Sequence, residues 1–483
     1  MLFNSIDFAI FLPIIFIIYW FFTGKNIKYQ NLLILIASYV FYGWWDWRFL
    51  SLIFFSTIVD YTVGLNLGRY NKPSTRKILL IVSICVNLGL LGFFKYYNFF
   101  LDNLNTAFSF FGQPVSLQSL HIILPVGISF YTFQTLSYTI DVFKRKIEPT
   151  SNFLSFAAFV SFFPQLVAGP IERASSLLPQ FESKRRFDYD QAVDGLRQIL
   201  WGFIKKVVIA DTCAEFVDLI FNSPGAYSGS TLLLGALFFT FQIYGDFSGY
   251  SDIAIGTARL FGFKLMRNFA FPYFSRDIAE FWRRWHISLT TWFRDYLYIP
   301  LGGSRGSMQK TIRNTFIIFL VSGFWHGANW TFIAWGGLHA FLFIPLLIMN
   351  KNRKNLDIVA KRKKIPSAKE ILNMGITFMI VVLTWILFRA NDIGNAFEIF
   401  KGIFSVSLFS IPSFDGTDKA AVLILLIFLF LIIEWSGREH EYAIMKIGLN
   451  WPRLLRWSFY SFLVFIIGIY MQTTETPFIY FQF

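Results

Sequence analysis

The chain has 483 residues, of which 55% are hydrophobic and only 15% are charged, and its formal net charge is +14. A soluble domain usually carries about 25% charged residues, and the mean hydropathy here is +0.52. Apolar runs of about 20 residues, the length that crosses a hydrocarbon core, recur along the chain. The composition therefore excludes an ordinary soluble protein and predicts a multi-pass membrane protein with a single integral domain.

The basic residues and the cysteines exclude two further classes. The Lys and Arg residues stand in short clusters between apolar runs, as they do in the cytoplasmic loops of membrane proteins. We therefore expect no nucleic-acid binding. The two cysteines, Cys85 and Cys213, lack the spacing of metal ligands, so we expect no metal site.

The N-terminal part, residues 1–145, is predicted to consist of membrane spans. Lys25 and Lys28 follow the first apolar run, which marks a cytoplasmic loop and places the N-terminus outside. The further spans of this part are expected near residues 31–47, 49–67, 77–97 and 121–141.

The apolar run 152–168 is predicted to be re-entrant. Basic clusters stand on both sides of it, at 144–146 and 184–186, so both of its ends belong on the cytoplasmic side. Pro164 interrupts the run, and proline breaks a helix. Broken backbone is tolerated at membrane depth only where protein, rather than lipid, surrounds it.

Two later segments combine apolar residues with charges. The segment 193–222 carries Lys205 and Lys206 in mid-run, and spanning, tilted and interfacial placements all remain open. The string "FWRRWHISLTTWFRDYLYIP" mixes aromatic residues with arginines, which is typical of an amphipathic interfacial segment. The apolar runs 314–328 and 331–349 are then predicted to form a hairpin, which completes a central part of residues 146–349.

The C-terminal part, residues 350–483, begins with the basic loop 350–364. The charge of this loop, like that of 184–186, has two interpretations. It either holds the loop in the cytoplasm, or docks the phosphates of coenzyme A or an acidic acyl carrier. Three more spans, which bring the expected total to about 11 or 12 and leave the C-terminus outside, are predicted near 371–389, 420–435 and 457–472.

Histidine is scarce, and His326 is the most unusual of the five. It lies about 18 Å along a helix from Asn314, where its apolar run begins, so we predict a position near mid-bilayer. An ionisable group at that depth is costly and is a functional candidate by default. The alternative is a neutral, hydrogen-bonded structural histidine. His339, in the returning run, is either structural or lines the same cavity, and His286 stands on the amphipathic segment.

Two carboxylates also fall within an apolar stretch. The string "GDFSGYSDIAIG" places Asp246 and Asp252 among small residues. Buried carboxylates need partners, and we expect Arg259 or Arg276 to supply them. We interpret both aspartates as architectural rather than catalytic.

Several long strings resemble the membrane-bound O-acyltransferase family. They are "FYTFQTLSYTIDVF", "FFPQLVAGPIER", "QIYGDFSGYSDIAIG", "RNFAFPYFSRDIAEFWRRWHISLTTWFRDYLYIPLGG" and "SGFWHGANWTFIAWGGLHA". The resemblance is closest to the alginate O-acetyltransferase-like branch, which also includes peptidoglycan O-acetylating and D-alanyl-exporting members. It implies that His326, in the "WHG" string, is catalytic and that His286, in the "FWRRWH" string, is its partner in the site.

The resemblance further implies an all-α fold around a central tunnel, with the catalytic core in 146–349. The implied reaction is acyl transfer to a hydroxyl from a cytoplasmic thioester, such as acetyl-CoA, with no tightly bound cofactor. His326 would act as general base, and His286 would orient it or hydrogen-bond the thioester carbonyl. A transient acyl-His326 is also open. The residues expected to line the tunnel are Trp325, Trp330, His339, Asn329, Gln134 and Asp246.

The C-terminal tail "TTETPFIYFQF" places Tyr480 among phenylalanines. An aromatic interfacial anchor is one interpretation. The other is that the tail folds into the outer mouth of the tunnel, where the Tyr480 hydroxyl is the acyl acceptor or relay. The tail resembles that of a small membrane peptide that works with D-alanyl-exporting members.

The resemblance also sets expectations for location and partners. We expect the bacterial cytoplasmic membrane, lipid as the surrounding partner, an extracytoplasmic hydrolase-like acetyltransferase and an acyl carrier in the cytoplasm. The expected function is O-acetylation of an alginate-like exopolysaccharide or of peptidoglycan. D-alanyl transfer to teichoic acid and a non-enzymatic acyl transporter are the alternatives.

Overall fold

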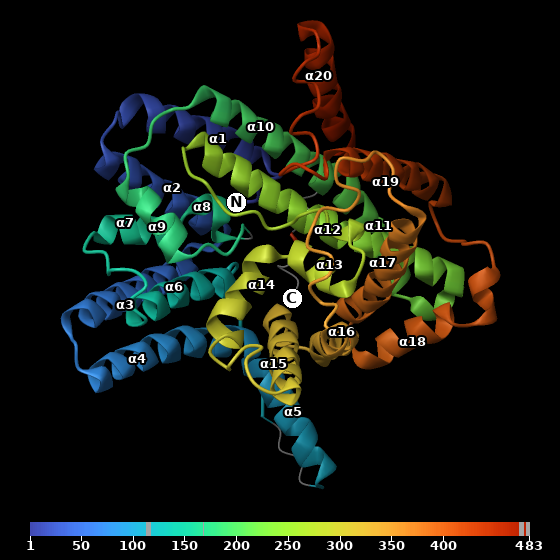
Figure 1. Ribbon diagram of the computed structural model, residues 1–483, viewed down its shortest axis with the longest axis horizontal. Coiled ribbons are helices and arrows are strands. Elements are labelled where there is room, and N and C mark those ends of the chain that lie inside the picture. The colour runs from blue at the N-terminus through green and yellow to red at the C-terminus, as the bar shows by residue number, and fades with distance from the viewer. Residues whose placement is uncertain (113–116, 168, 473–477, 480–483) are drawn as a thin grey trace. The chain divides into compact units, whose positions relative to one another are not determined.

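The computed structural model describes residues 1–112, 117–167, 169–472 and 478–479, which form α-helices, 3-10 turns and π-helical turns and contain no strand. The chain packs as two compact units, one of Met1–Ala192 with Thr257–Met266 and the other of Val193–Gly256 with Arg267–Phe483. Figure 1 shows the course of the chain. The predicted all-α class is confirmed, whereas the single integral domain stays a prediction.

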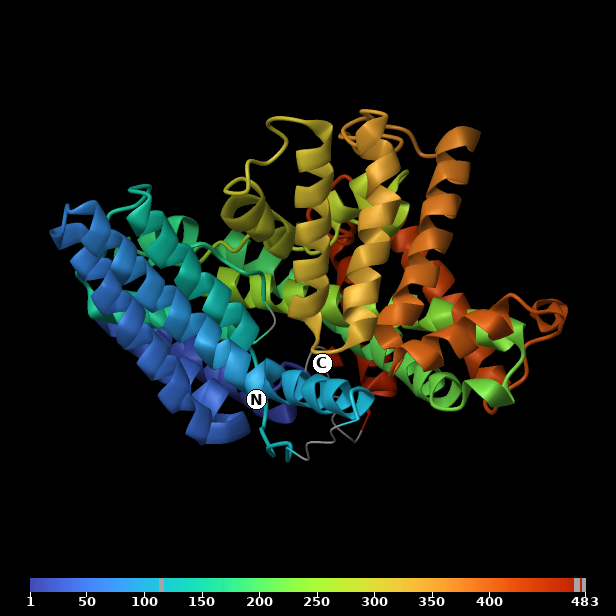
Figure 2. The same cartoon turned by 90° about the horizontal axis from the view of Figure 1, so that it is seen from below.

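The first unit is a group of packed helices. Helices α3, α4 and α6 pack against one another, and Figure 2 shows them side by side in blue to teal. The helices of this unit are α1 (Ile6–Ile17), α2 (Ile27–Asp46), α3 (Leu50–Arg69), α4 (Pro73–Leu91), α5 (Tyr97–Phe110), α6 (Ile128–Phe143), α7 (Phe153–Val160), α8 (Phe163–Leu166), α9 (Ala174–Glu182) and the start of α10 (Tyr189–Phe203).

The run 152–168 is broken, as predicted, into the short helices α7 and α8. Side chains from other helices satisfy backbone groups at the break, because buried backbone groups left without a partner are costly. The Phe163 N–H donates to Ser38 Oγ at 3.1 Å, and Gln134 Nε2 donates to the Phe159 carbonyl at 2.7 Å. Gln134, expected to line the tunnel, thus supports this break.

Helix α6 begins at Ile128 rather than near residue 121. Gly127, which precedes it, has a φ of 75°, and a Cβ there would lie 2.6 Å from the Leu166 carbonyl oxygen. Only glycine fits this left-handed, crowded position. The apolar residues 121–127 therefore form an irregular, non-helical segment that leads into the helix.

The second unit contains the remaining helices. Most of α12 belongs to it, and the π-helical turn η4 (Ile204–Ala210) joins α10 to α11. Its helices are α11 (Asp211–Phe221), α12 (Gly229–Leu260), α13 (Ile278–Arg284), α14 (Ile287–Phe293), α15 (Met308–His326), α16 (Trp330–Ile348), α17 (Ala368–Arg389), α18 (Ile393–Ile403), α19 (Thr417–Gly437) and α20 (Arg453–Tyr470).

The predicted hairpin of 314–349 is confirmed as α15 and α16, and α17 packs against α16. Figure 2 shows these three helices, yellow to orange, as neighbours. Two glycines let the hairpin close. A Cβ at Gly323 would lie 2.2 Å from the Phe332 carbonyl oxygen, and one at Gly336 would lie 2.3 Å from the Phe319 carbonyl oxygen. Small residues permit such backbone approach between membrane helices.

Seven helical stretches of the described residues are long and apolar enough to cross a membrane. Two of them, Ile27–Arg69 and Pro73–Phe110, each contain more than one helix. Helix α15 is outside this set, because its first turns carry Lys310 and Arg313. The multi-pass class is confirmed, while the total of about 11 or 12 spans and the central tunnel stay predictions.

The glycine contact predicts a position-specific effect in α16. Replacing Gly336 by Ala should lower the thermal denaturation midpoint of the detergent-solubilised protein, because the new methyl group must displace α15. Overpacking of this kind costs about 1–3 kcal/mol. Gly337→Ala is the matched control, since its Cβ would meet only Leu320 Cδ2, at 3.7 Å. Equal midpoints for the two variants would contradict the close crossing.

Candidate active site

His326 is the last residue of α15, and Gly327 follows it in an extended conformation. The helix begins at Met308, where Ser307 accepts a hydrogen bond from Lys310 N–H. The helix ends at His326, so this residue lies at the turn into α16 rather than in the middle of the helix. The His326 side chain is buried, with 2% of its surface exposed. Its depth in the bilayer stays a prediction.

Aromatic rings surround the His326 imidazole. Its ring centroid lies 5.0 Å from that of Trp325, 5.3 Å from that of Trp335 and 5.3 Å from that of Phe388. These residues come from α15, α16 and α17, so the packing of three helices forms the enclosure. Such a wall excludes water, which would otherwise hydrolyse a reactive acyl donor.

His286 lies beside His326, at the junction between α13 and α14. The two ring centroids are 6.3 Å apart, and the His286 centroid is 6.0 Å from that of Trp325. Burial lowers the pKa of His286 from 6.5 to about 3, so this imidazole is neutral at neutral pH. The structure thus brings together the two histidines that the sequence singled out.

Asn268 holds the His286 ring from one side. His286 Nδ1 lies 3.1 Å from Asn268 Oδ1, and the same oxygen accepts hydrogen bonds from Ser288 N–H, at 3.3 Å, and Ser288 Oγ, at 2.9 Å. The Asn268 amide nitrogen donates to Ser251 Oγ at 3.2 Å. On the other side of the ring, His286 Nε2 is buried and has no hydrogen-bond partner among the described residues.

The backbone of the segment before α13 supports the helix junction. The Ile287 N–H donates to the Asn268 carbonyl at 2.9 Å, and the Ala270 N–H donates to the Arg284 carbonyl at 2.9 Å. His286 itself has a φ of 44°, an uncommon conformation for a residue with a side chain. The two backbone hydrogen bonds hold the chain on either side of this residue.

His339 belongs to the aromatic wall. The Trp282 indole N–H donates to His339 Nδ1 at 3.2 Å, and the ring centroids of Trp282 and Trp335 lie 5.0 and 4.9 Å from its own. His339 contacts the enclosure of His326 through Trp335, which lies between them. Of the two interpretations of His339, these contacts favour the structural one.

The other candidates for tunnel lining have separate positions. Trp325 contacts both histidines. Trp330, the first residue of α16, is 55% exposed. Asn329 caps α16, where its Oδ1 accepts from Thr331 N–H and its amide donates to the Asn391 carbonyl. Trp325 therefore lies at the two histidines, whereas Asn329 serves as a helix cap.

The two aspartates have lysine partners, and the prediction of Arg259 or Arg276 is wrong. Lys206 Nζ lies 2.9 Å from Asp246 Oδ1, and Lys205 Nζ lies 2.6 Å from Asp252 Oδ2. Both lysines are buried on the π-helical turn η4. They stand in mid-run because they neutralise carboxylates of α12, which a buried charge requires.

The described end of the tail reaches the same part of α12. The Ile479 N–H donates to Asp246 Oδ2 at 2.7 Å. The Phe478 ring centroid lies 5.7 Å from that of Phe247, and the Phe247 centroid lies 4.7 Å from that of His286. Phe247 therefore contacts both the tail and the active site. Tyr480, the predicted acceptor or relay, lies outside the described residues.

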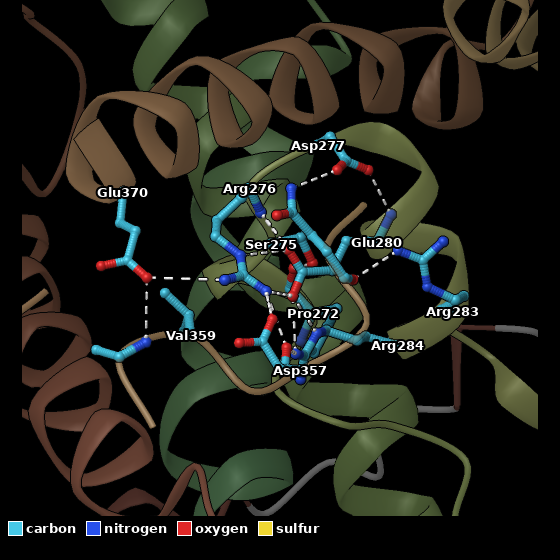
Figure 3. A network of polar contacts seen from close by, with 12 residues as sticks. Pro272, Ser275, Arg276, Asp277, Glu280, Arg283, Arg284, Asp357, Val359 and Glu370 are labelled. Carbon is cyan, nitrogen blue, oxygen red and sulfur yellow. Dashed lines mark hydrogen bonds and ion pairs between the residues drawn. The ribbon is translucent and has the colours of Figure 1, made fainter. Parts of the chain in front are cut away.

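A closed network of charges holds the basic loop against α13 (Figure 3). Glu280, which is 1% exposed, accepts hydrogen bonds from Arg276, at 3.0 Å, and Arg284, at 2.7 Å. Arg276 also pairs with Asp357 of the loop at 2.9 Å, and Arg283 donates to two loop carbonyls. Arg276 is thus engaged in this network. The network fixes the helix that leads into His286.

Part of the basic charge in the first unit is structural. Arg185 is buried, and it donates to Asn31 Oδ1 at 2.6 Å and to the Gln180 carbonyl at 2.9 Å. Its neighbour Lys184 lines an open cavity of about 940 Å³ together with Lys25 and Lys28. One of the three residues 184–186 therefore stabilises the fold, while Lys184 remains accessible to an anion.

The network around Glu280 predicts a loss of stability on neutralisation. Glu280→Gln keeps the size of the side chain but leaves buried arginine charge without its carboxylate, which costs about 3–5 kcal/mol. The thermal denaturation midpoint in detergent should fall clearly. Asp357→Asn is the control, because the Asp357 side chain is 66% exposed and an exposed pair contributes about 0–1 kcal/mol. Equal midpoints for the two variants would refute the buried network.

Sequence reasoning missed the residues that surround the two histidines. Asn268, Ser288, Trp335 and Phe388 all stand in the strings or spans that were recognised. No local pattern, however, connects Asn268 to His286, or Phe388 to His326. Only the tertiary packing of α13 to α17 and of the segment before α13 shows these contacts.

The helical fold and the apolar spans define a multi-pass membrane protein, and comparison with known proteins gives its family. Residues 47–388 match the model of the membrane-bound O-acyltransferase family. The chain belongs to this family and is a membrane O-acyltransferase.

Named relatives cover most of the chain. The chain is 41% identical to the Probable alginate O-acetylase AlgI of Pseudomonas aeruginosa, over 92% of this chain and 82% of the relative. It is 38% identical to the Peptidoglycan O-acetyltransferase of Helicobacter pylori, over 83% of this chain and 80% of the relative. It is 30% identical to the Teichoic acid D-alanyltransferase of Streptococcus thermophilus, over 56% of this chain and 69% of the relative.

Proposed function

We propose that this O-acyltransferase moves an acetyl group from a cytoplasmic thioester, with acetyl-CoA as donor, across the membrane for O-acetylation of an extracytoplasmic polysaccharide. The observation that carries the proposal is the contact of the two buried histidines, His326 and His286, inside an aromatic enclosure. The acceptor is an alginate-like polymer or peptidoglycan. Acetyl is favoured because the relatives named for O-acetylation share more of the chain than the D-alanyltransferase does.

The proposed chemistry is a direct transfer with His326 as general base. The imidazole takes the proton of the acceptor hydroxyl, because a hydroxyl is a poor nucleophile until it is deprotonated. The oxygen attacks the thioester carbonyl, the C–S bond breaks, and the leaving thiolate receives the proton from His326. No net proton is gained or lost. The second route, through an acyl-His326 intermediate, differs in leaving a covalent mark on the protein.

The general-base role predicts a large and selective loss of rate. His326→Ala should lower kcat for thioester turnover by about 100- to 10,000-fold, the range expected for loss of a general base. The measurement is thiol release by the purified protein in detergent, with the denaturation midpoint as a check on folding. The control is His121→Ala, at an exposed position. A folded His326→Ala protein with the wild-type rate would favour the transporter alternative.

The tail supports a proposal for the acceptor. Ile479 is hydrogen-bonded to Asp246, and Phe478 packs on Phe247, which itself contacts His286. Tyr480 is the next residue in the sequence. We propose that its hydroxyl receives the acyl group and passes it to an extracytoplasmic hydrolase-like acetyltransferase. The alternative for the tail remains an aromatic anchor at the membrane interface.

The acceptor role predicts that one oxygen atom decides transfer to the polymer. Tyr480→Phe should abolish polymer O-acetylation in cells, because the ring remains but the nucleophile is lost. Tyr470→Phe is the matched control, at the last residue of α20. Polymer-bound acetate and the amount of inserted protein are measured together. Wild-type acetylation by Tyr480→Phe would rule out the acceptor role.

The remaining proposals concern location and partners. We place the protein in the bacterial cytoplasmic membrane, with lipid around it and both termini outside the cytoplasm. The accessible basic residues, including Lys184, support docking of an anionic donor, either coenzyme A or an acyl carrier. D-alanyl transfer to teichoic acid is the second candidate, supported by the relative of that name, and thioester assays with the two acyl groups distinguish it.

A further inference from the structure

The environment of His286 is asymmetric in a way that bears on its chemistry. One edge of the ring contacts the Asn268 amide, where His286 Nδ1 lies 3.1 Å from Asn268 Oδ1. The opposite nitrogen, Nε2, is buried without a hydrogen-bond partner among the described residues. A neutral imidazole has one donor nitrogen and one acceptor nitrogen. The contact on Nδ1 therefore decides what Nε2 offers to the site.

A backbone N–H shows that the Asn268 side-chain atom facing His286 is the amide oxygen and not the amide nitrogen. Amide oxygen and nitrogen are assigned from their hydrogen bonds, and here the Ser288 N–H lies 3.3 Å from the atom concerned. A backbone N–H can only donate, so this atom is the oxygen. The Ser288 hydroxyl also reaches it, at 2.9 Å, and the amide nitrogen donates to Ser251 instead. The hydrogen between Asn268 and His286 must consequently belong to His286 Nδ1.

We infer that Asn268 is a positioning residue that holds His286 in the Nδ1–H tautomer, so that His286 Nε2 enters the reaction as a hydrogen-bond acceptor. The inference deepens the proposed acyl transfer and rests on it. Asn268 does not touch the reacting atoms. It acts through the ring of His286, as an orienting group does for a catalytic imidazole.

The Nδ1–H tautomer is compatible with only one of the two roles proposed for His286, which are to orient His326 and to hydrogen-bond the thioester carbonyl. Polarising the thioester carbonyl requires an N–H on Nε2, which the ring does not have. Orienting His326 requires an acceptor, which Nε2 provides. The ring centroids of the two histidines are 6.3 Å apart, and such contacts tighten when substrate binds. A hydrogen bond from one His326 nitrogen to His286 leaves the proton transfer from the hydroxyl to the other nitrogen.

The tautomer can be read directly from the folded wild-type protein. In 15N-histidine-labelled protein, the His286 signals should show a protonated Nδ1 and an unprotonated Nε2 at neutral pH. His286→Gln identifies these signals by removing them. In Asn268→Leu, which has nearly the same size but no hydrogen bonds, the signals should shift toward a mixture of tautomers. A wild-type ring with its hydrogen on Nε2 would overturn the inference whatever the enzyme transfers.

Kinetics supply the second readout. Asn268→Leu should lower kcat by about 10- to 100-fold, as loss of an orienting partner typically does, with little change in KM. Asn268→Asp retains an acceptor oxygen for Nδ1 and should recover both the tautomer and part of kcat. Ser251→Ala removes only the bond at the far end of the amide, so the wild-type tautomer should persist.

Two outcomes would contradict the positioning role. One is an unchanged tautomer and kcat in Asn268→Leu. The other is an equal loss of kcat in Asn268→Leu and Asn268→Asp with the tautomer intact in both, which indicates a merely structural residue. Because the wild-type signals are recorded on the folded protein, a variant that fails to fold does not remove the test. Absence of acyl transfer by the wild type would count against the proposed function alone.

Discussion

The candidate active site depends on the backbone hydrogen bonds around His286, where α13 ends and α14 begins. These bonds come from a segment outside the two helices. Non-helical backbone within a membrane protein needs protein partners, because no bulk water is present to satisfy it. Asn268 and Ala270 provide them through the Ile287 N–H and the Arg284 carbonyl. His286 is held at a positive φ, which costs about 1–3 kcal/mol unless the surroundings impose it. The break turns the imidazole toward His326.

In the second unit, the ion pairs involve other residues than those that surround His286. The carboxylates of α12 are neutralised by Lys205 and Lys206, and Glu280 is enclosed by arginines. His286, by contrast, contacts neutral partners: an amide, a hydroxyl and aromatic rings. Burial therefore keeps this imidazole neutral, which is the form that can accept a hydrogen bond. The ion pairs hold the helices in position, and the neutral groups surround the candidate catalytic histidine.

Much of this arrangement could be predicted from the sequence, and the failures have physical causes. Apolar runs, charge clusters and Pro164 predicted the helical hairpin and the break between α7 and α8, because these are local properties. The partners of Asp246 and Asp252 were predicted wrongly, since a π-helical turn brings two mid-run lysines to α12. The contact of Asn268 with His286 had no local signal at all. Contacts between residues far apart in the sequence depend on tertiary packing, which cannot be read from local patterns in a single sequence.

Phe247 lies between His286 and the described end of the tail, and it helps to exclude water from the site. An acyl donor in a wet site is hydrolysed, so an acceptor must reach the carbonyl without opening the enclosure. Phe247 contacts His286 on one side and Phe478 on the other, while Asp246, its neighbour on α12, binds the Ile479 N–H. The described end of the chain therefore packs against the residue that covers one side of His286. The aromatic side chain of Phe478 thereby limits the access of water to that side of the ring.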